Sequence, residues 1–288
     1  MRIGLLTAAR ANSISRSIER GVHLGAAEAR QTANLFGNDV ELFEAPAAPG
    51  PVARAAKLLS ERKVQVIIGS SPDDADALSR FAQQSHIVFL NVASRSPELR
   101  SACRRNTFHI EASDAMYSAA ESLATRPASR AGREALTAGH MVSTNLWSPT
   151  LEKYGASQIN DRFRARYGTG MDGGAWAGWA AVKMVSESSL RARSNDASKL
   201  IAYLESPGTT FDGHKGWPLS FRAVDHQLRQ PLYVATRNPA EANRETVRDV
   251  PELRGGGTEA APAGGARLNP MLDRIVGAPP GAGCGWAR

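Results

Sequence analysis

Two segments of the sequence place small hydroxyl side chains where a predicted strand ends and a predicted helix begins. The first, "IIGSSPDD", contains Ser70 and Ser71, and the second, "FLNVASRSPELR", contains Ser94 and Ser96. The first backbone amides of a helix have no partner within that helix, so together with hydroxyl groups they suit a carboxylate. Because ligands of parallel α/β sheets bind at the carboxyl ends of strands, we expect the two loops to form one binding site.

Three acidic residues, Asp73, Asp74 and Asp76, follow the first pair of serines. Their charges complement the positive end of the helix dipole and would repel a phosphate dianion. The ammonium group of a zwitterion, in contrast, could approach an aspartate. An ordinary capped helix without a ligand remains the alternative interpretation of these residues.

Other patterns that could support catalysis or cofactor binding are incomplete. "GTGMDG", residues 168–173, has the G-x-G-x-x-G spacing, but a basic helix precedes it instead of the strand that dinucleotide binding requires. Ser220, Asp225 and His226 lie in a predicted hairpin, which provides neither a fixed nucleophile nor an oxyanion hole. Histidines and cysteines lack the spacing of metal ligands. We therefore expect no enzyme activity, no cofactor and no metal site.

The composition is that of a globular chain. Its 288 residues, 42% of them apolar, suffice for one core or slightly more. The net charge of +7 raises the question of a nucleic-acid partner, but the arginines are scattered, so we expect none. No apolar run is long enough to span a membrane. The apolar stretch near the N-terminus, about six residues, is too short for a signal peptide, so Ile3–Thr7 is predicted as a buried strand and no export signal is visible.

Strand and helix patterns alternate regularly through the first 124 residues, which predicts an α/β fold with a doubly wound parallel sheet. The expected strands cover residues 2–7, 39–45, 64–69, 87–93 and 106–111, and the expected helices 17–33, 51–62, 74–84, 96–103 and 113–124.

The alternation stops after this region. Residues 125–148 contain no convincing buried strand. The segments that follow are predicted as three helices and a hairpin, at residues 150–168, 175–193, 196–206 and 217–235. Residues 254–267 are rich in Gly, Ala and Pro, which is typical of disorder.

Several segments resemble the type I periplasmic binding proteins, the receptors of branched-chain amino-acid uptake systems. They are "RGVHLGAAEA", "AAKLLSERKVQVIIGS", "FLNVASRSPELR", "NTFHIEASDAM" and "FDGHKGWPLSF". "CRRNTFHIEASDAM", "QLRQPLYVA" and the cysteine near the C-terminus are similar to a narrower branch that accompanies quinoprotein alcohol oxidation in methylotrophic bacteria. The resemblance covers residues 1–123 and about 145–235.

This resemblance implies two α/β lobes, of which the second is mostly an insertion after Leu123. Only about two dozen residues occupy that place here, so we expect a second lobe that is largely missing. The chain then consists of an N-terminal part of lobe one, a shortened connection, a return segment of lobe one and a low-complexity tail, at residues 1–124, 125–148, 149–235 and 236–288. A second-lobe strand within the connection would contradict an interpretation as lobe one alone.

The resemblance also implies a function. The loops that hold the ligand carboxylate correspond to Ser70, Ser71, Ala93, Ser94 and Arg95. We expect a periplasmic solute-binding protein for amino acids or similar small carboxylates, working with an ABC permease of the membrane. Without the opposite wall of the cleft, binding should be weakened or lost, because polar contacts strengthen when water is excluded.

The chain has two cysteines, Cys103 and Cys284, whose spacing alone leaves two free thiols or one disulfide open. The resemblance implies an extracytoplasmic location, where disulfides persist, and therefore a Cys103–Cys284 bridge.

Two alternative functions remain at this level. A single lobe could be an interaction protein that self-associates through the apolar rim where lobe two would pack. The chain could also be a non-functional remnant of an in-frame deletion, with its start placed after the lost signal.

Overall fold

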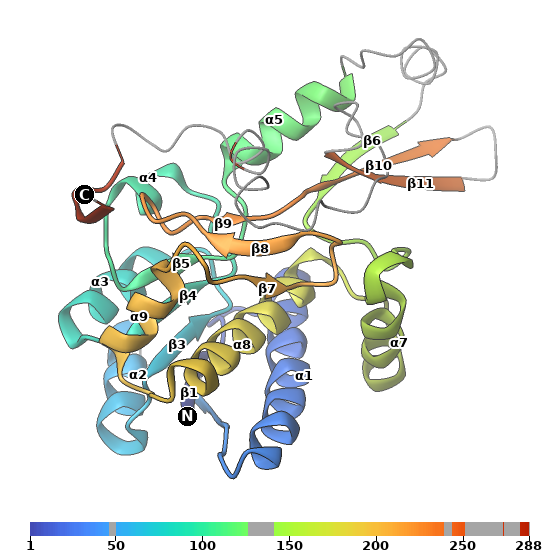
Figure 1. Ribbon diagram of the computed structural model, residues 1–288. Coiled ribbons are helices and arrows are strands. Elements are labelled where there is room, and N and C mark those ends of the chain that lie inside the picture. The colour runs from blue at the N-terminus through green and yellow to red at the C-terminus, as the bar shows by residue number, and fades with distance from the viewer. Residues whose placement is uncertain (46–49, 126–140, 239–243, 251–272, 274–282, 288) are drawn as a thin grey trace.

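The computed structural model describes residues 1–45, 50–125, 141–238, 244–250, 273 and 283–287. Figure 1 shows a parallel sheet enclosed by helices and, apart from it, a smaller sheet near α5. None of the described helices is both long and apolar enough to cross a membrane.

The central sheet has five parallel strands in the order β2-β1-β3-β4-β5, which confirms the predicted doubly wound α/β fold. Of the three inner strands, β3 and β4 are buried along their whole length and β1 is buried except at Arg2, as expected for apolar runs covered on both faces. The strands are β1 (Arg2–Leu6), β2 (Glu41–Ala45), β3 (Val66–Gly69), β4 (Val88–Asn91) and β5 (Thr107–His109).

Helices cover both faces of this sheet. Side chains of one face, such as Ile3 and Ile68, pack with α1 and α8, whereas Ile67 and Phe89 pack with α2 and α3 on the other face. The helices of the first half are α1 (Ser13–Leu35), α2 (Pro51–Lys57) with its π-helical extension η1 (Leu58–Arg62), α3 (Ala75–Ser85), α4 (Pro97–Ser101) and α5 (Asp114–Thr125).

The return segment supplies a short 3-10 turn η2 (Lys153–Gly155) and the helices α7 (Ala156–Tyr167), α8 (Gly173–Ala192) and α9 (Ala197–Glu205). Backbones of α1 and α8 approach closely, since a Cβ on Gly21 would lie 1.9 Å from the carbonyl oxygen of Ala175. Glycine is therefore required at this crossing, and Trp176 and Trp179 of α8 are buried.

The predicted hairpin is only partly correct. Strands β7 (Phe211–Asp212), β8 (Pro218–Phe221) and β9 (Leu228–Arg229) form a three-stranded antiparallel sheet. The end of the predicted hairpin, residues 233–235, instead belongs to β10 (Tyr233–Asn238), which pairs in a different sheet.

That other sheet corrects two expectations. It has three antiparallel strands in the order β11-β10-β6, where β6 is Met141–Asn145 and β11 is Arg244–Asp249. A strand thus lies in the connection at 125–148, and another lies in the tail at 236–288. Residues Val142–Asn145 are at most half-buried, which explains why no buried pattern indicates a strand there. The expectation of lobe one alone is therefore wrong, because the described residues form a second small sheet besides the parallel sheet.

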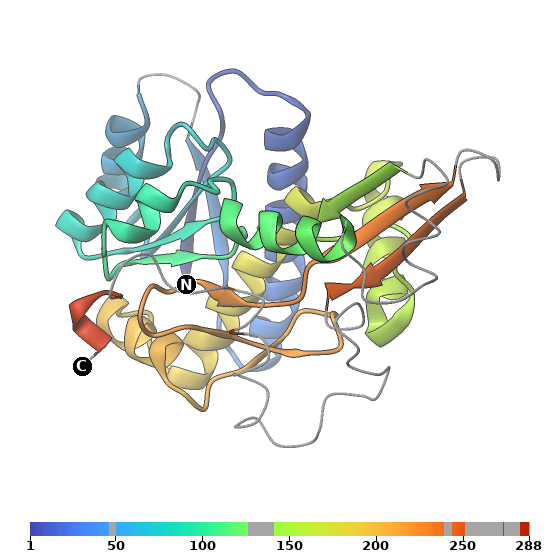
Figure 2. The same ribbon diagram turned by 90° about the horizontal axis from the view of Figure 1, so that it is seen from above.

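This small sheet packs against α5 and lies apart from the parallel sheet in both views (Figures 1 and 2). The predicted low-complexity segment 254–267 and most of the connection, 126–140, lie outside the described residues.

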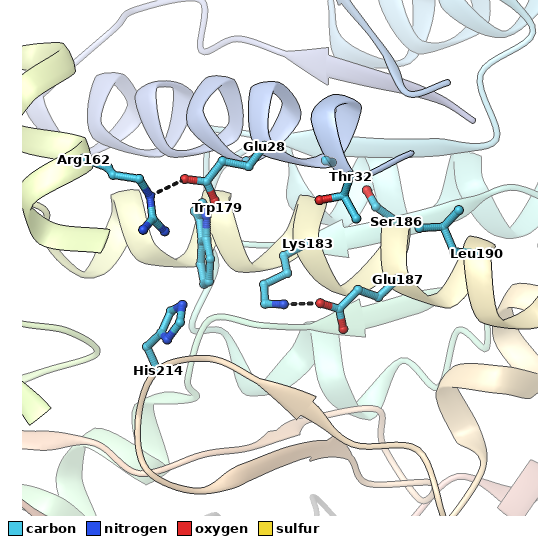
Figure 3. Close-up of a pocket in the computed structure, with 11 residues that line it drawn as sticks. Glu28, Thr32, Arg162, Trp179, Lys183, Ser186, Glu187, Leu190 and His214 are labelled. Carbon is cyan, nitrogen blue, oxygen red and sulfur yellow. Dashed lines mark hydrogen bonds and ion pairs between the residues drawn. The ribbon is translucent and has the colours of Figure 1, made fainter. Parts of the chain in front are cut away.

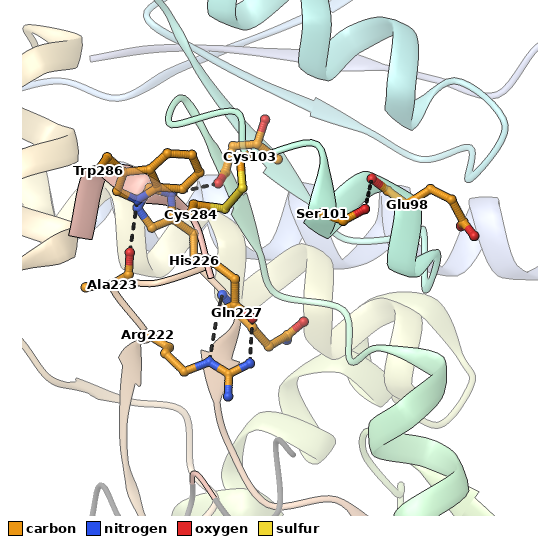
Figure 4. The surroundings of a disulfide bond; sticks show 11 residues. Glu98, Ser101, Cys103, Arg222, Ala223, His226, Gln227, Cys284 and Trp286 are labelled. Carbon is orange, nitrogen blue, oxygen red and sulfur yellow. Dashed lines mark hydrogen bonds and ion pairs between the residues drawn. A yellow bond between two sulfur atoms is a disulfide. The ribbon is translucent and has the colours of Figure 1, made fainter. Parts of the chain in front are cut away.

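The predicted disulfide between Cys103 and Cys284 is confirmed. It joins residues 181 positions apart in the sequence, with their Cα atoms at 5.3 Å. The amide of Cys284 donates to the carbonyl of Val224 (2.8 Å), and the indole nitrogen of Trp286 donates to that of Ala223 (2.9 Å). The bridge therefore docks the C-terminal segment on the turn between β8 and β9 (Figure 4).

Candidate functional site

The structure brings the two predicted loops together at the carboxyl edge of the parallel sheet. Ser70 and Ser71 follow β3 directly, and Ala93–Arg95 follow β4 after one residue. Strands β3 and β4 are neighbours, with Gly69 opposite Asn91. We call the surface formed by Ser71, Ala93 and Arg95 the carboxyl-edge wall.

Ser70 is committed to internal contacts. Its side chain is fully buried, donates to Oε1 of Glu19 (2.7 Å) and accepts from the amide of Ala8 (2.9 Å). It therefore ties the loop after β3 to α1 and to the loop after β1. Ser71 is partly exposed, and its hydroxyl and amide find no acceptor among the described residues. Of the two serines, only Ser71 is available to a ligand.

The loop after β4 is shaped by Asn91, which the sequence analysis did not single out. Its Oδ1 accepts from the amide of Ser94 (2.9 Å) and its Nδ2 donates to the carbonyl of Ser94 (2.8 Å). The same Nδ2 lies 3.1 Å from Nδ1 of His109, whose pKa is lowered by burial and by nearby Arg100. Neutral His109 can thus accept this bond. Ser94 is buried and positions the loop, which leaves the partly exposed Ala93 at its surface.

Arg95 supplies the positive charge of the wall. Its guanidinium carbon lies 3.8 Å from the centroid of the Tyr117 ring, and its Nε lies 3.6 Å from Oε1 of Glu111. The hydroxyl of Tyr117 donates to the same Glu111 oxygen at 2.7 Å. Burial raises the pKa of Glu111, while Arg95 acts in the opposite direction. The Arg95 side chain is half-exposed, so it is held on one side and open to a ligand on the other.

A second arginine lies buried beneath this loop. Arg100 donates to the carbonyls of Ser96 (2.9 Å) and Glu111 (2.7 Å) and to Oε1 of Gln227 (2.7 Å). Burial lowers the pKa of Arg100 to about 10, so it stays charged at neutral pH. These bonds connect the loop after β4 with the end of β5 and with the segment that follows the turn at Asp225, which makes the wall rigid.

The acidic residues after Ser71 are largely neutralised. Asp74 pairs with buried Arg54 (3.2 Å), which also donates to the carbonyl of Thr7 (2.6 Å). Asp76 pairs with Arg104 at 2.7 Å and with Arg80 at 2.8 Å. Because two of the three predicted acids face arginines, their repulsion of an anion is smaller than the sequence suggests. Ser96 caps α4 as expected, accepting from the amide of Leu99 (3.2 Å).

No group of three or more potential metal-ligating side chains occurs in the part of the chain that the structure describes. Ser220, Asp225 and His226 do lie near the β8–β9 turn, but Asp225 is bonded to Arg222, and His226 to Glu205 and the carbonyl of Thr107. These residues build the turn and its contacts.

Comparison with known proteins identifies the fold. Residues 119–242 match the family model described as periplasmic binding protein. No curated protein matches the chain.

Solved structures match over most of the chain. An ABC transporter substrate-binding protein from Sphaerobacter thermophilus has a TM-score of 0.69 at 13% identity, covering 86% of this chain and 96% of its own. The leucine-, isoleucine-, valine-, threonine- and alanine-binding protein from Brucella ovis has a TM-score of 0.70 at 10% identity, with 86% and 94% covered. A solute-binding protein from Rhodopseudomonas palustris, in complex with 3,4-dihydroxybenzoic acid, has a TM-score of 0.68 at 14% identity, with 87% and 97% covered. The predicted resemblance is therefore confirmed: the chain has the fold of type I periplasmic binding proteins, and its residues 119–242 match the sequence model of that family.

Proposed function

We propose that this protein is the solute-binding component of an ABC-type uptake system and that it binds amino acids or similar small carboxylates at the carboxyl-edge wall. The observation that carries the proposal is the position of Arg95, which Tyr117 and Glu111 hold beside the loop after β4 with half of its side chain exposed. Family match and fold support a location in the periplasm and an ABC permease as the membrane partner.

In this proposal a ligand carboxylate accepts hydrogen bonds from the amide or hydroxyl of Ser71 and from the guanidinium of Arg95. Ala93 lies beside them, and its amide, 3.4 Å from Oδ1 of Asn91, would turn to the ligand in place of that long contact. Ser70 and Ser94 keep the two loops in place and do not touch the ligand. A planar guanidinium can bind a carboxylate with two parallel hydrogen bonds, which gives orientation as well as attraction.

The ligands named for two solved relatives support this class. The Brucella ovis protein is named for five amino acids, and the Rhodopseudomonas palustris structure holds 3,4-dihydroxybenzoic acid. All of these compounds carry a carboxylate. The described part of the present chain contributes only a three-stranded second sheet in place of a second α/β lobe. We therefore propose that binding is weak, since an ion pair in contact with water is worth little.

The test is titration calorimetry of the full chain with L-leucine and with benzoate. We expect one of them to bind and Arg95→Met to weaken that binding at least tenfold. Arg80→Met is the matched control, because Arg80 is an exposed arginine on α3 that pairs with Asp76. Absence of binding by both compounds, or equal loss in both variants, would contradict the proposal.

A second candidate function is that of an interaction protein, favoured by the open edges of the small sheet. Among the described residues, β6 and β11 each pair only with β10, and β6 carries no charged side chain that would discourage pairing with another strand. Sedimentation of the purified chain tests this function, and a strictly monomeric profile at all concentrations would contradict self-association.

A further inference from the structure

We propose a second small-molecule site, between α1 and α8, that takes a small zwitterion such as a free amino acid. The cavity has a volume of about 160 Å³ and shares no residue with the carboxyl-edge wall. It is built by four parts of the fold: α1, α7, α8 and the turn after β7 (Figure 3). Its charged and aromatic lining side chains are Glu28, Arg162, Trp179, Lys183, Glu187 and His214.

An aromatic side chain of fixed orientation forms one wall of the cavity. Trp179 is 2% exposed, and its indole nitrogen donates to Oε2 of Glu28 at 2.8 Å. The ring of His214 stacks on the indole, with centroids 5.5 Å apart. Ligand sites generally combine such an apolar surface with a few polar groups, and this cavity has both.

Two ion pairs border the cavity. Nε of Arg162 lies 2.7 Å from Oε1 of Glu28, and the ammonium group of Lys183 pairs with Glu187. Residues 179, 183 and 187 lie on successive turns of α8, so the level of Trp179 and that of Glu187 are about 12 Å apart along the helix. Figure 3 shows Lys183 between these two levels.

The balance of charge selects the class of ligand. Two cations and two carboxylates border the cavity, so a dianion or a dication would meet like charges without compensation. A zwitterion can place its carboxylate beside Lys183 and its ammonium group beside Glu187, in exchange for the pair that these two residues form with each other. Both existing ion pairs are accessible to water, with side chains 24–43% exposed. Such pairs contribute little to stability, so a ligand can replace one partner at a small cost in free energy.

Size limits the ligand further. A volume of 160 Å³ corresponds to roughly five water molecules at about 30 Å³ each. Larger ligands normally occupy cavities of about 300 Å³ or more. A small amino acid such as alanine therefore fits better than a large one.

The experiment is a titration of the ¹⁵N-labelled full chain with L-alanine, followed by NMR at the indole N–H signal of Trp179. Trp179→Phe assigns that signal. We expect alanine to shift it in a saturable manner, whereas acetate and methylammonium, which carry one charge each, bind at least tenfold more weakly. No shift with alanine, or an equal response to acetate, would overturn the proposal.

Variants separate this site from the carboxyl-edge wall. Lys183→Met and Glu187→Gln should each weaken the alanine response at least tenfold, and Lys199→Met, an exposed lysine on α9 outside the cavity, should leave it unchanged. Arg95→Met should also leave it unchanged. An unaltered alanine response in both cavity variants, or loss of the response in Arg95→Met, would contradict a second site. The proposed function is tested separately, by the effect of Arg95→Met on calorimetric binding of L-leucine or benzoate.

Discussion

The guanidinium of Arg95 lies over the ring of Tyr117 at 3.8 Å, and the hydroxyl of that ring binds Glu111, the same carboxylate that Arg95 approaches. One tyrosine on α5 thus orients both charges of the pair. The positive charge at the carboxyl-edge wall is positioned by a helix that starts after β5, although Arg95 itself follows β4.

This relationship predicts a graded effect of substitutions at Tyr117. Tyr117→Phe keeps the ring beneath Arg95, so carboxylate binding should fall less than threefold. Tyr117→Leu removes the ring and should weaken binding about tenfold, since a cation–π contact is worth about 0.5–2 kcal/mol. Calorimetry measures both variants, and thermal unfolding controls for lost stability. Equal effects of Phe and Leu would show that the ring does not position Arg95.

The hydrogen bonds of Glu205 lead us to expect that the protein loses stability in acid. Partial burial acts to raise its pKa, but hydrogen bonds from Arg105 and His226 outweigh this and lower the pKa to about 2 from 4.5. A carboxyl group with a lowered pKa in the folded state stabilises the protein above the ordinary pKa of that group. This stability should be lost as the pH falls from about 4.5 to 2. After allowance for solvent screening, we expect about 1–2 kcal/mol.

Urea unfolding at several pH values in this window measures the effect of Glu205. Glu205→Gln should reduce the dependence of the free energy of unfolding on pH. Glu152→Gln, which replaces an exposed carboxylate, should leave that dependence unchanged. A Glu205→Gln variant with the same pH dependence as the parent chain would contradict the assignment.

The disulfide predicts a large contribution to stability. A loop of 181 residues closed by Cys103 and Cys284 should contribute about 4–5 kcal/mol in the chain-entropy description. Cys284→Ser should lower the free energy of unfolding by about this amount and release Trp286 from its place 5.2 Å from His226. Denaturant unfolding measures the loss, and Trp286→Ala shows how much of it comes from the docked indole. Two reactive thiols in the oxidised, denatured protein would disprove the bridge.

The close crossing of α1 and α8 leads us to expect that position 21 tolerates no side chain. Gly21→Ala would place a methyl group 1.9 Å from the carbonyl oxygen of Ala175, so the helices must move apart. We expect a loss of about 3 kcal/mol in the free energy of unfolding. Gly208→Ala, where an added Cβ meets no atom within 4 Å, should change it by less than about 0.5 kcal/mol. Similar values for the two variants in thermal unfolding would argue against tight packing.

The parallel sheet could be predicted because its signals are local. Strands β1, β3 and β4 are short, largely apolar runs, and each of the five strands is followed by a helix, so the alternation of strands and helices is visible in the residue order. Strand β6 gives no such signal. The side chains of residues 142–145 are partly or fully exposed, and β6 exists as a strand because β10, from a distant part of the chain, supplies its hydrogen bonds.

The candidate site, too, was predictable from the sequence only in part. Ser70, Ser71, Ala93, Ser94 and Arg95 could be found from their position after two predicted strands and from the family resemblance. Their separate roles could not, since they depend on Glu19, Asn91, Glu111 and Tyr117, most of which are distant in sequence. Lys215 is a further example: its buried ammonium group binds the carbonyls of Leu146 and Pro231 and so connects three segments.

The sequence by itself determined the α/β class, the five parallel strands and the position of the two loops proposed to bind a carboxylate, because apolar periodicity and helix starts are properties of neighbouring residues. Only the tertiary structure decided that a second small sheet remains, that Ser70 is internal while Arg95 is open, and that a charged cavity lies between α1 and α8. Each of these results from contacts between segments far apart in the chain, which packing selects and residue order does not display.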